Sequence, residues 1–146
     1  MGQQQLLLII LGVIIVGIAV AVGITMFQDN AISASKDAVI NDLVQLSAKA
    51  QQHYRKPVSL GGGGNSYILL TATPAGLASL VSTAFSNNDN GIYRITIAGT
   101  LTDVVLTGTS KTQNVDGSYP QIFMTITPTG NILSTAGWTG VSTLPN

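Results

Sequence analysis

An apolar run near the start of the chain limits the folds open to it most strongly. Leu6 to Phe27 contains no charged side chain, and only three glycines and Thr25 interrupt its apolar residues. As a helix rising about 1.5 Å per residue, this run would be roughly 33 Å long, enough to cross a bilayer core. A cleaved secretory signal would show a basic start, a shorter apolar core and a small-residue cleavage site, and none of these is clear here. We therefore expect the run to be retained in the mature protein.

The apolar run leads into an amphipathic pattern without a clear helix stop. Apolar residues recur at three- and four-residue steps, which places them on one stripe of a helix. These are Ile32, Val39, Leu43, Leu46, Ala50 and Tyr54. Val44 and Ile40 would widen the stripe, and charged residues, Asp42 among them, mostly fall elsewhere. Pro57 and the glycines at 61–64 end the pattern. Asp29 and Asn30 are also able to cap a second helix, so a bend there stays open.

The period changes after the glycine run. Alternation in two-residue steps predicts strands at 92–99, 103–110 and 121–128, with one face buried and the other wet, and a fourth strand is expected at 132–135. In the first strand Tyr93, Ile95 and Ile97 share the buried face, and in the third Ile122, Met124 and Ile126 do so.

Turn and helix signals separate these strands. Asp116-Gly117 and Gly130-Asn131 are turn pairs. Pro74 to Phe85 repeats at helical steps and predicts a short helix, with a strand as the alternative.

The predicted fold is α+β: a long N-terminal helix, apolar in its first half and amphipathic in its second, packed against a small C-terminal antiparallel sheet. The predicted parts are a helix over 1–56, a Pro/Gly linker over 57–66 and a sheet head over 67–146. Within the helix, 1–27 would form a membrane or filament core and 28–56 the amphipathic half.

The inventory of reactive side chains is poor. The chain has no cysteine, no glutamate and one histidine, His53, and its formal net charge is zero with 8% charged residues. These features argue against an enzyme and against a nucleic-acid partner, and no catalytic, cofactor or metal site is predicted. The segment GGGGNS lacks the Lys-Ser/Thr of a phosphate loop and is read as a flexible turn. His53 is expected to be a partly exposed surface residue. Asp103 and Asp116 are expected to bond their own backbone, with a calcium site as the alternative.

The layout resembles the type IV pilin family. The matching features are Met1, the apolar run at 6–27, the stripe at 32–54 and the strands from Ile92. The segment LSAKAQQHYRKPVSLGGGG also resembles a group of bacterial pilin-like proteins. The family usually has a glutamate at the fifth mature position, where this chain has Gln5, and many bacterial members have a proline near the position of Val22 and Gly23.

Two readings of the first residue stay open. If Met1 opens the mature protein, as we expect, a leader was removed before it. If Met1 is instead the initiator, Met-Gly would be an abnormally short leader.

The resemblance implies the structural subunit of an extracellular, type IV pilus-like filament. Its partners would be identical subunits, with the inner membrane and the pilus assembly machinery before assembly. The expected assembly residues are Met1, Gln5, Leu6, Ile10, Gly12, Ile14, Gly17, Gly23 and Phe27. The three glycines would let helices approach closely and would allow the helix to loosen locally. The alternatives are a single-span, membrane-anchored binding module and a minor pseudopilin of a secretion system.

Overall fold

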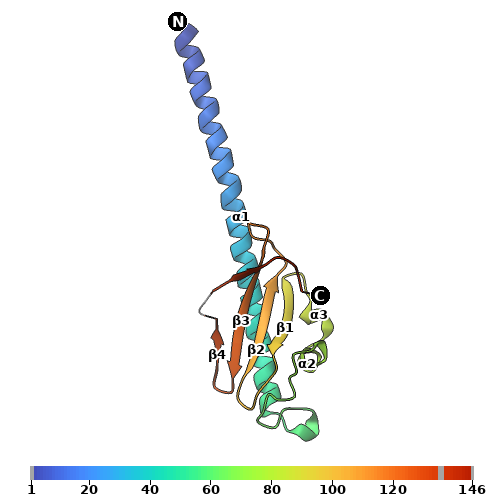
Figure 1. The fold of residues 1–146 in the computed structure, drawn as a ribbon. Coiled ribbons are helices and arrows are strands. Elements are labelled where there is room, and N and C mark those ends of the chain that lie inside the picture. The colour runs from blue at the N-terminus through green and yellow to red at the C-terminus, as the bar shows by residue number, and fades with distance from the viewer. Residues whose placement is uncertain (1, 135–136, 146) are drawn as a thin grey trace.

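The computed structural model describes residues 2–134 and 137–145. Its elements in chain order are α1 (Gly2–Arg55), η1 (Val58–Leu60), α2 (Pro74–Ala78), α3 (Thr83–Ser86), β1 (Gly91–Ile97), β2 (Val104–Ser110), β3 (Tyr119–Thr127), β4 (Gly130–Leu133) and β5 (Thr139–Val141). One long helix packs against a small antiparallel sheet, which confirms the predicted α+β fold (Figure 1).

The N-terminal helix is continuous. α1 has 54 residues and is about 81 Å long at the standard rise. It has no break at Asp29 and Asn30, so the bend left open by the sequence is absent. The segment from Gly12 to Gly23 is also helical throughout in this single chain.

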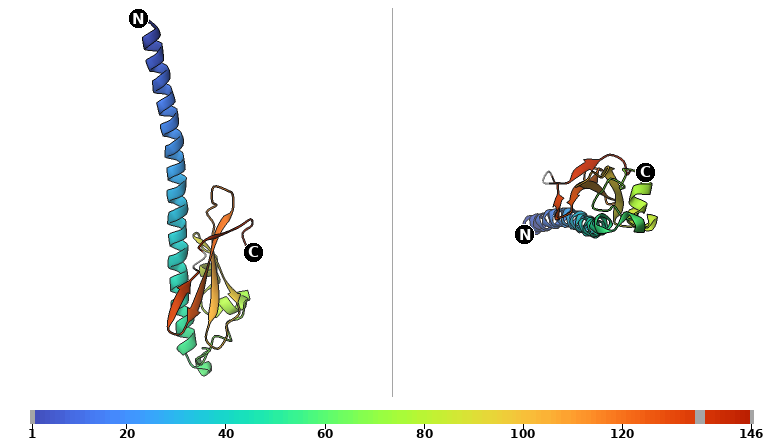
Figure 2. Two further views of the ribbon diagram at one scale, coloured as in Figure 1. Left: turned by 60° about the vertical axis from the view of Figure 1, so that its left-hand side comes forward. Right: turned by 90° about the horizontal axis from the view of Figure 1, so that it is seen from below.

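The C-terminal half of α1 lies along one face of the sheet (Figure 2). Its stripe residues Val39, Leu43, Leu46 and Ala50 are fully buried, as predicted. Gly108 on β2 faces them, and a Cβ added there would lie 2.7 Å from Val39 Cγ1. A glycine at this position therefore allows the helix to approach the strand closely.

The margins of the stripe are less regular than predicted. Tyr54 is only partly buried, and its ring lies 4.8 Å from the ring of Tyr67. Val44 was predicted to widen the stripe but is 47% exposed, because the sheet covers a narrower strip of the helix.

The sheet has the strand order β1-β2-β3-β4, and β5 pairs with the start of β3. Along β3, Ile122, Met124 and Ile126 are buried while the residues between them are half-buried, so the predicted alternation is confirmed. The four predicted strands are present, with the fourth at 130–133, and residue 135 of the predicted range 132–135 lies outside the described residues. The sequence missed β5, whose three residues are too few to show a period.

Three local predictions were wrong. Ile97 is 58% exposed, because a register shift between Ile95 and Ile97 ends the alternation of β1. Gly130 belongs to β4 and pairs with Thr127, so the turn consists of residues 128 and 129. The helix expected from Pro74 is two short helices, because the backbone is extended at Ser82.

The glycine run is a compact cap on α1 rather than a flexible turn. The N–H groups of Gly63, Gly64 and Asn65 donate to the carbonyl oxygens of His53, Lys56 and Tyr54. These bonds satisfy carbonyl groups that a helix end otherwise leaves without partners. A Cβ added at Gly63 would lie 1.9 Å from the Ser66 carbonyl oxygen, so this position requires glycine.

Candidate functional site

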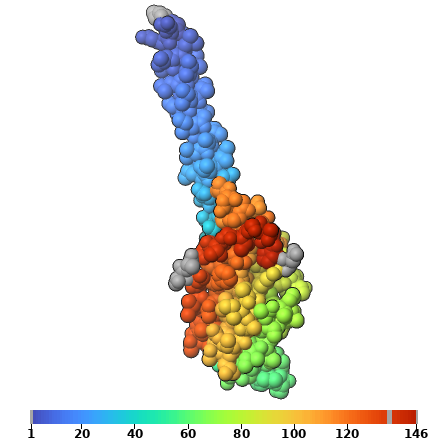
Figure 3. Space-filling model, viewed as in Figure 1, coloured from blue at the N-terminus to red at the C-terminus, as the bar shows by residue number. Residues whose placement is uncertain are grey.

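The N-terminal half of α1 extends away from the head (Figures 2 and 3), and its apolar side chains are uncovered. We call residues 2–27 the uncovered segment. Its large apolar side chains from Leu6 to Phe27 are between 49% and 78% exposed. The described residues contain one helix that is long and apolar enough to cross a membrane, and this segment is its apolar part. Apolar residues occur on every side of it, so one flat partner surface would not cover it.

The structure leaves the predicted assembly residues on this exposed surface. Gln5, Leu6, Ile10, Ile14 and Phe27 are all exposed. A Cβ added at Gly12, Gly17 or Gly23 would meet no atom within 4 Å outside the neighbouring helix backbone. None of these residues is brought to the head, and Met1 lies outside the described residues.

Asp42 was predicted to lie away from the apolar stripe, but it is 8% exposed and lies on the sheet-facing side of α1. Its Oδ2 accepts hydrogen bonds from Tyr93 Oη at 2.7 Å, Asn88 Nδ2 at 2.9 Å and Asn90 Nδ2 at 3.0 Å. We call these four residues the Asp42 cluster. It ties the C-terminal half of α1 to β1 and to the turn that precedes β1.

The charge of Asp42 is stabilised by the same contacts. Burial alone would raise the Asp42 pKa, but the hydrogen bonds from Tyr93, Asn90 and Asn88 hold it below its ordinary value. Burial and the Asp42 carboxylate together raise the pKa of Tyr93 far above its usual range. The pair is therefore a carboxylate accepting from a neutral phenol, which is a fixed structural contact across a wide pH range.

Polar contacts also fix the other margin of the helix. Asn131 Nδ2 donates to Ser47 Oγ at 2.6 Å, and Gln51 Nε2 donates to Asn131 Oδ1 at 3.1 Å. Nearer the uncovered segment, the Lys36 ammonium lies 5.8 Å from the centre of the Trp138 ring. Polar contacts on both sides of the apolar stripe thus set the rotation of the head about α1.

His53 is buried beneath the glycine cap, which corrects the prediction of a partly exposed side chain. It is 7% exposed, because Gly63 packs directly against its ring. Burial lowers the His53 pKa, and the positive charge of Lys56 lowers it further. Its Nδ1 has no hydrogen-bond partner in the described part of the chain. The neutral imidazole is therefore part of the packing at the helix end.

The two candidate calcium ligands bond to neighbours in their own turns. Asp116 Oδ1 accepts from the Ser118 N–H at 2.9 Å and from Ser118 Oγ at 2.6 Å, and Asp103 Oδ1 accepts from the Thr100 hydroxyl. Asp116 thus forms the backbone bond predicted for an aspartate in a turn, whereas the carboxylate of Asp103 bonds to a side chain instead. Within residues 2–134 and 137–145, no group of three or more His, Cys, Asp or Glu side chains is placed to hold a metal ion.

Comparison of the chain with protein-family models, curated proteins and solved structures found no match. The likeness to type IV pilins therefore depends on the residues and their pattern.

Proposed function

We propose that this chain is the repeating structural subunit, the major pilin-like protein, of an extracellular type IV pilus-like helical filament. Polymerisation would occur through the uncovered segment, whose exposure is the observation that carries the proposal. The subunits would wait in the cytoplasmic membrane before assembly and would then form a homopolymer on the cell surface.

The uncovered segment is too apolar to remain in water. Sixteen large apolar side chains between Leu6 and Phe27 are exposed. Leaving each one in water costs roughly 1.5–3 kcal/mol relative to burial, which sums to tens of kcal/mol. That sum exceeds the roughly 5–15 kcal/mol that stabilises a typical domain. Only a bilayer or a bundle of similar helices can cover every side of such a segment.

Several features support a bundle as the final environment. The head is attached to α1 beyond the uncovered segment, so other copies have access to every side of it (Figure 1). Gly12, Gly17 and Gly23 offer places where neighbouring helices approach closely. Contacts between non-identical faces of identical subunits generate open helical filaments when the rotation does not close.

The first experiment compares the full chain with a truncated form that begins at Gln28. The full chain should yield filaments in the fraction sheared from cells, visible by electron microscopy, with a core made of α1. The truncated form should be soluble and should not polymerise. Filaments of the same kind from the truncated form would disprove the proposal.

A glycine substitution separates a filament from a simple membrane anchor. Gly17→Leu should leave membrane insertion intact, because a lipid environment accommodates the added side chain, but it should block close helix packing and greatly lower the filament yield. Val20→Leu is the matched control, since it also adds apolar volume but removes no glycine, and it should assemble. If the wild type inserts in membranes and never appears in the sheared fraction, the chain is instead an anchored binding module. If it occurs there only as a rare component of another polymer, it is a minor pseudopilin.

A further inference from the structure

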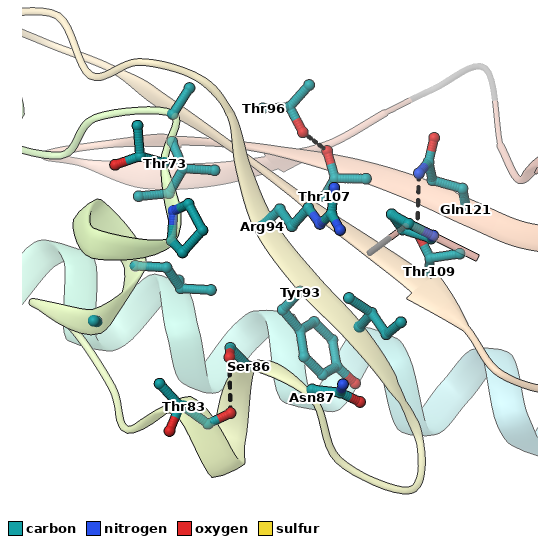
Figure 4. A pocket seen from close by; sticks show the side chains of 17 residues that line it. Thr73, Thr83, Ser86, Asn87, Tyr93, Arg94, Thr96, Thr107, Thr109 and Gln121 are labelled. Atoms are coloured by element: carbon teal, nitrogen blue, oxygen red, sulfur yellow. Dashed lines mark hydrogen bonds between the residues drawn. The ribbon is translucent and has the colours of Figure 1, made fainter. Parts of the chain in front are cut away.

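The head contains a cavity of about 680 Å³ beside β1 (Figure 4). Pro74 and Leu77 of the α2 helix form an apolar wall, and polar side chains of β1, β2 and β3 form another. Its volume falls within the roughly 300–1,000 Å³ typical of pockets for small molecules. Its residues are separate from the uncovered segment and from the stripe that joins the helix to the sheet.

Arg94 supplies the only formal charge among the described residues that line this cavity. Its Nη2 atom is buried and has no hydrogen-bond partner in the described part of the chain. A buried donor without a partner destabilises the fold, and a charged donor does so more strongly than a neutral one. No aspartate lines the cavity, so the described walls offer no carboxylate to the guanidinium.

Hydroxyl and amide groups line the same cavity as this cation (Figure 4). Gln121 Nε2 donates to Thr109 Oγ1 at 2.9 Å, and the hydroxyls of Thr96 and Thr107 are bonded to each other. A threonine hydroxyl carries one donor and two acceptor sites, so each of these groups keeps capacity for a further bond. Thr107 and Thr109 are 4% and 1% exposed, so their unused hydrogen-bonding sites lie inside the fold.

We propose that this cavity binds a small hydroxylated monocarboxylate, of which a sugar acid is the chemical class that fits. The carboxylate would pair with the Arg94 guanidinium, whose planar fork matches two carboxylate oxygens. Hydroxyl groups of the ligand would bond to the threonines and to Gln121, and its apolar face would rest on Pro74 and Leu77. A single guanidinium neutralises one negative charge, whereas a phosphate dianion would leave a second charge unpaired in a buried site.

The test uses the full chain in a neutral polyoxyethylene detergent, titrated separately with D-glucuronate, D-glucose and inorganic phosphate. Binding is followed by calorimetry and by the NMR signal of the Arg94 side chain. Glucuronate should bind saturably and about tenfold or more tightly than glucose or phosphate, because only it offers one carboxylate together with hydroxyls. Arg94→Gln should weaken glucuronate binding about tenfold or more. Arg55→Gln, the same change at an exposed arginine on the end of α1, should leave it unchanged.

A second variant at the same position distinguishes a loss of binding from a loss of folding. Arg94→Lys keeps the charge and the long stem but loses the fork, so it should bind glucuronate with intermediate affinity. The proposal would be overturned by equal affinity for glucuronate and glucose, by tighter binding of phosphate, or by no saturable binding of glucuronate. It would also be overturned if a folded Arg94→Gln or Arg94→Lys protein bound glucuronate with wild-type affinity. None of these outcomes depends on whether the chain polymerises.

Discussion

Substituting Asp42 with asparagine tests how the head is held on α1. Oδ2 of Asp42 accepts three hydrogen bonds, at 2.7, 2.9 and 3.0 Å. A hydrogen bond to a charged group contributes about 1.5–3 kcal/mol, against about 1 kcal/mol for a neutral one. Asparagine keeps an acceptor oxygen of the same size but loses the charge, so each bond is weakened by about 0.5–2 kcal/mol and the three together by about 1.5–6 kcal/mol. Relief of the burial cost of the carboxylate offsets part of this loss, and we expect Asp42→Asn to destabilise the head by about 2 kcal/mol.

The measurement is urea unfolding of the full chain in detergent, followed by the fluorescence of Trp138, the only tryptophan. With a urea dependence of about 2 kcal/mol per molar, the expected loss lowers the midpoint by about 1 M. Asp37→Asn is the matched control, because it makes the same change at an exposed position of the same helix, and it should change stability by less than about 0.5 kcal/mol. Tyr93→Phe should be destabilising alone and should cost less in the Asp42→Asn background.

The pH dependence provides an independent check. The folded pKa of Asp42 lies below its ordinary value of 3.8, so the carboxylate contributes stability above about that pH. This contribution is lost as the pH falls through the lower folded value, and the Asp42→Asn protein should lack that part of the acid sensitivity. An asparagine variant with wild-type stability and an unchanged acid profile would refute the reasoning, because the cluster would then add nothing beyond apolar packing.

Three further predictions concern other parts of the chain. Gln5→Leu should impair filament assembly and Gln5→Asn should impair it less, with little effect of salt, because a neutral amide sets the register through hydrogen bonds; normal yield from the Leu variant, scored by microscopy, would show that apolar packing alone sets it. Burial lowers the folded pKa of His53, so below about pH 6.5 protonation favours the unfolded chain and the free energy of unfolding falls as the pH drops. His53→Gln removes this titration, so its free energy of unfolding, measured by urea titration at each pH, should fall less over that range. Gly108→Val should destabilise the head by about 3 kcal/mol or more, because its side chain would overlap Val39 on α1, whereas Gly130→Val, where an added Cβ meets nothing within 4 Å, should be mild in the same assay.

The features that the sequence predicted are those that repeat. The α1 stripe from Val39 to Ala50 and the alternation along β3 each supply several residues with one period, and the structure buries both sets. The apolar run is equally easy to recognise, because it would still be evident in the sequence if any single residue were changed. Periodicity therefore predicted the elements, the buried faces and the α+β class.

Single residues whose partners lie far along the chain could not be predicted in this way. Asp42 resembles an ordinary polar helix position, because its donors lie 46 to 51 residues later. His53 is buried by a cap whose shape depends on backbone bonds of several glycines. Arg94 alternates with the buried residues of β1 as predicted, but the cavity that it lines forms only where α2, α3, β2 and β3 come together in the fold.

The separation of the uncovered segment from the head has a thermodynamic consequence. Because no large apolar side chain of residues 2–27 is buried against the head, substitutions in the two parts should change the unfolding free energy additively. A subunit that exchanged lipid for neighbouring helices would not need to repack the core of its head, because residues 2–27 are not part of that core. The free energy of that exchange would come from small differences in van der Waals packing and hydrogen bonding, since lipid chains are as apolar as the helices that replace them. A chain with this geometry is suited to reversible transfer between the two surroundings.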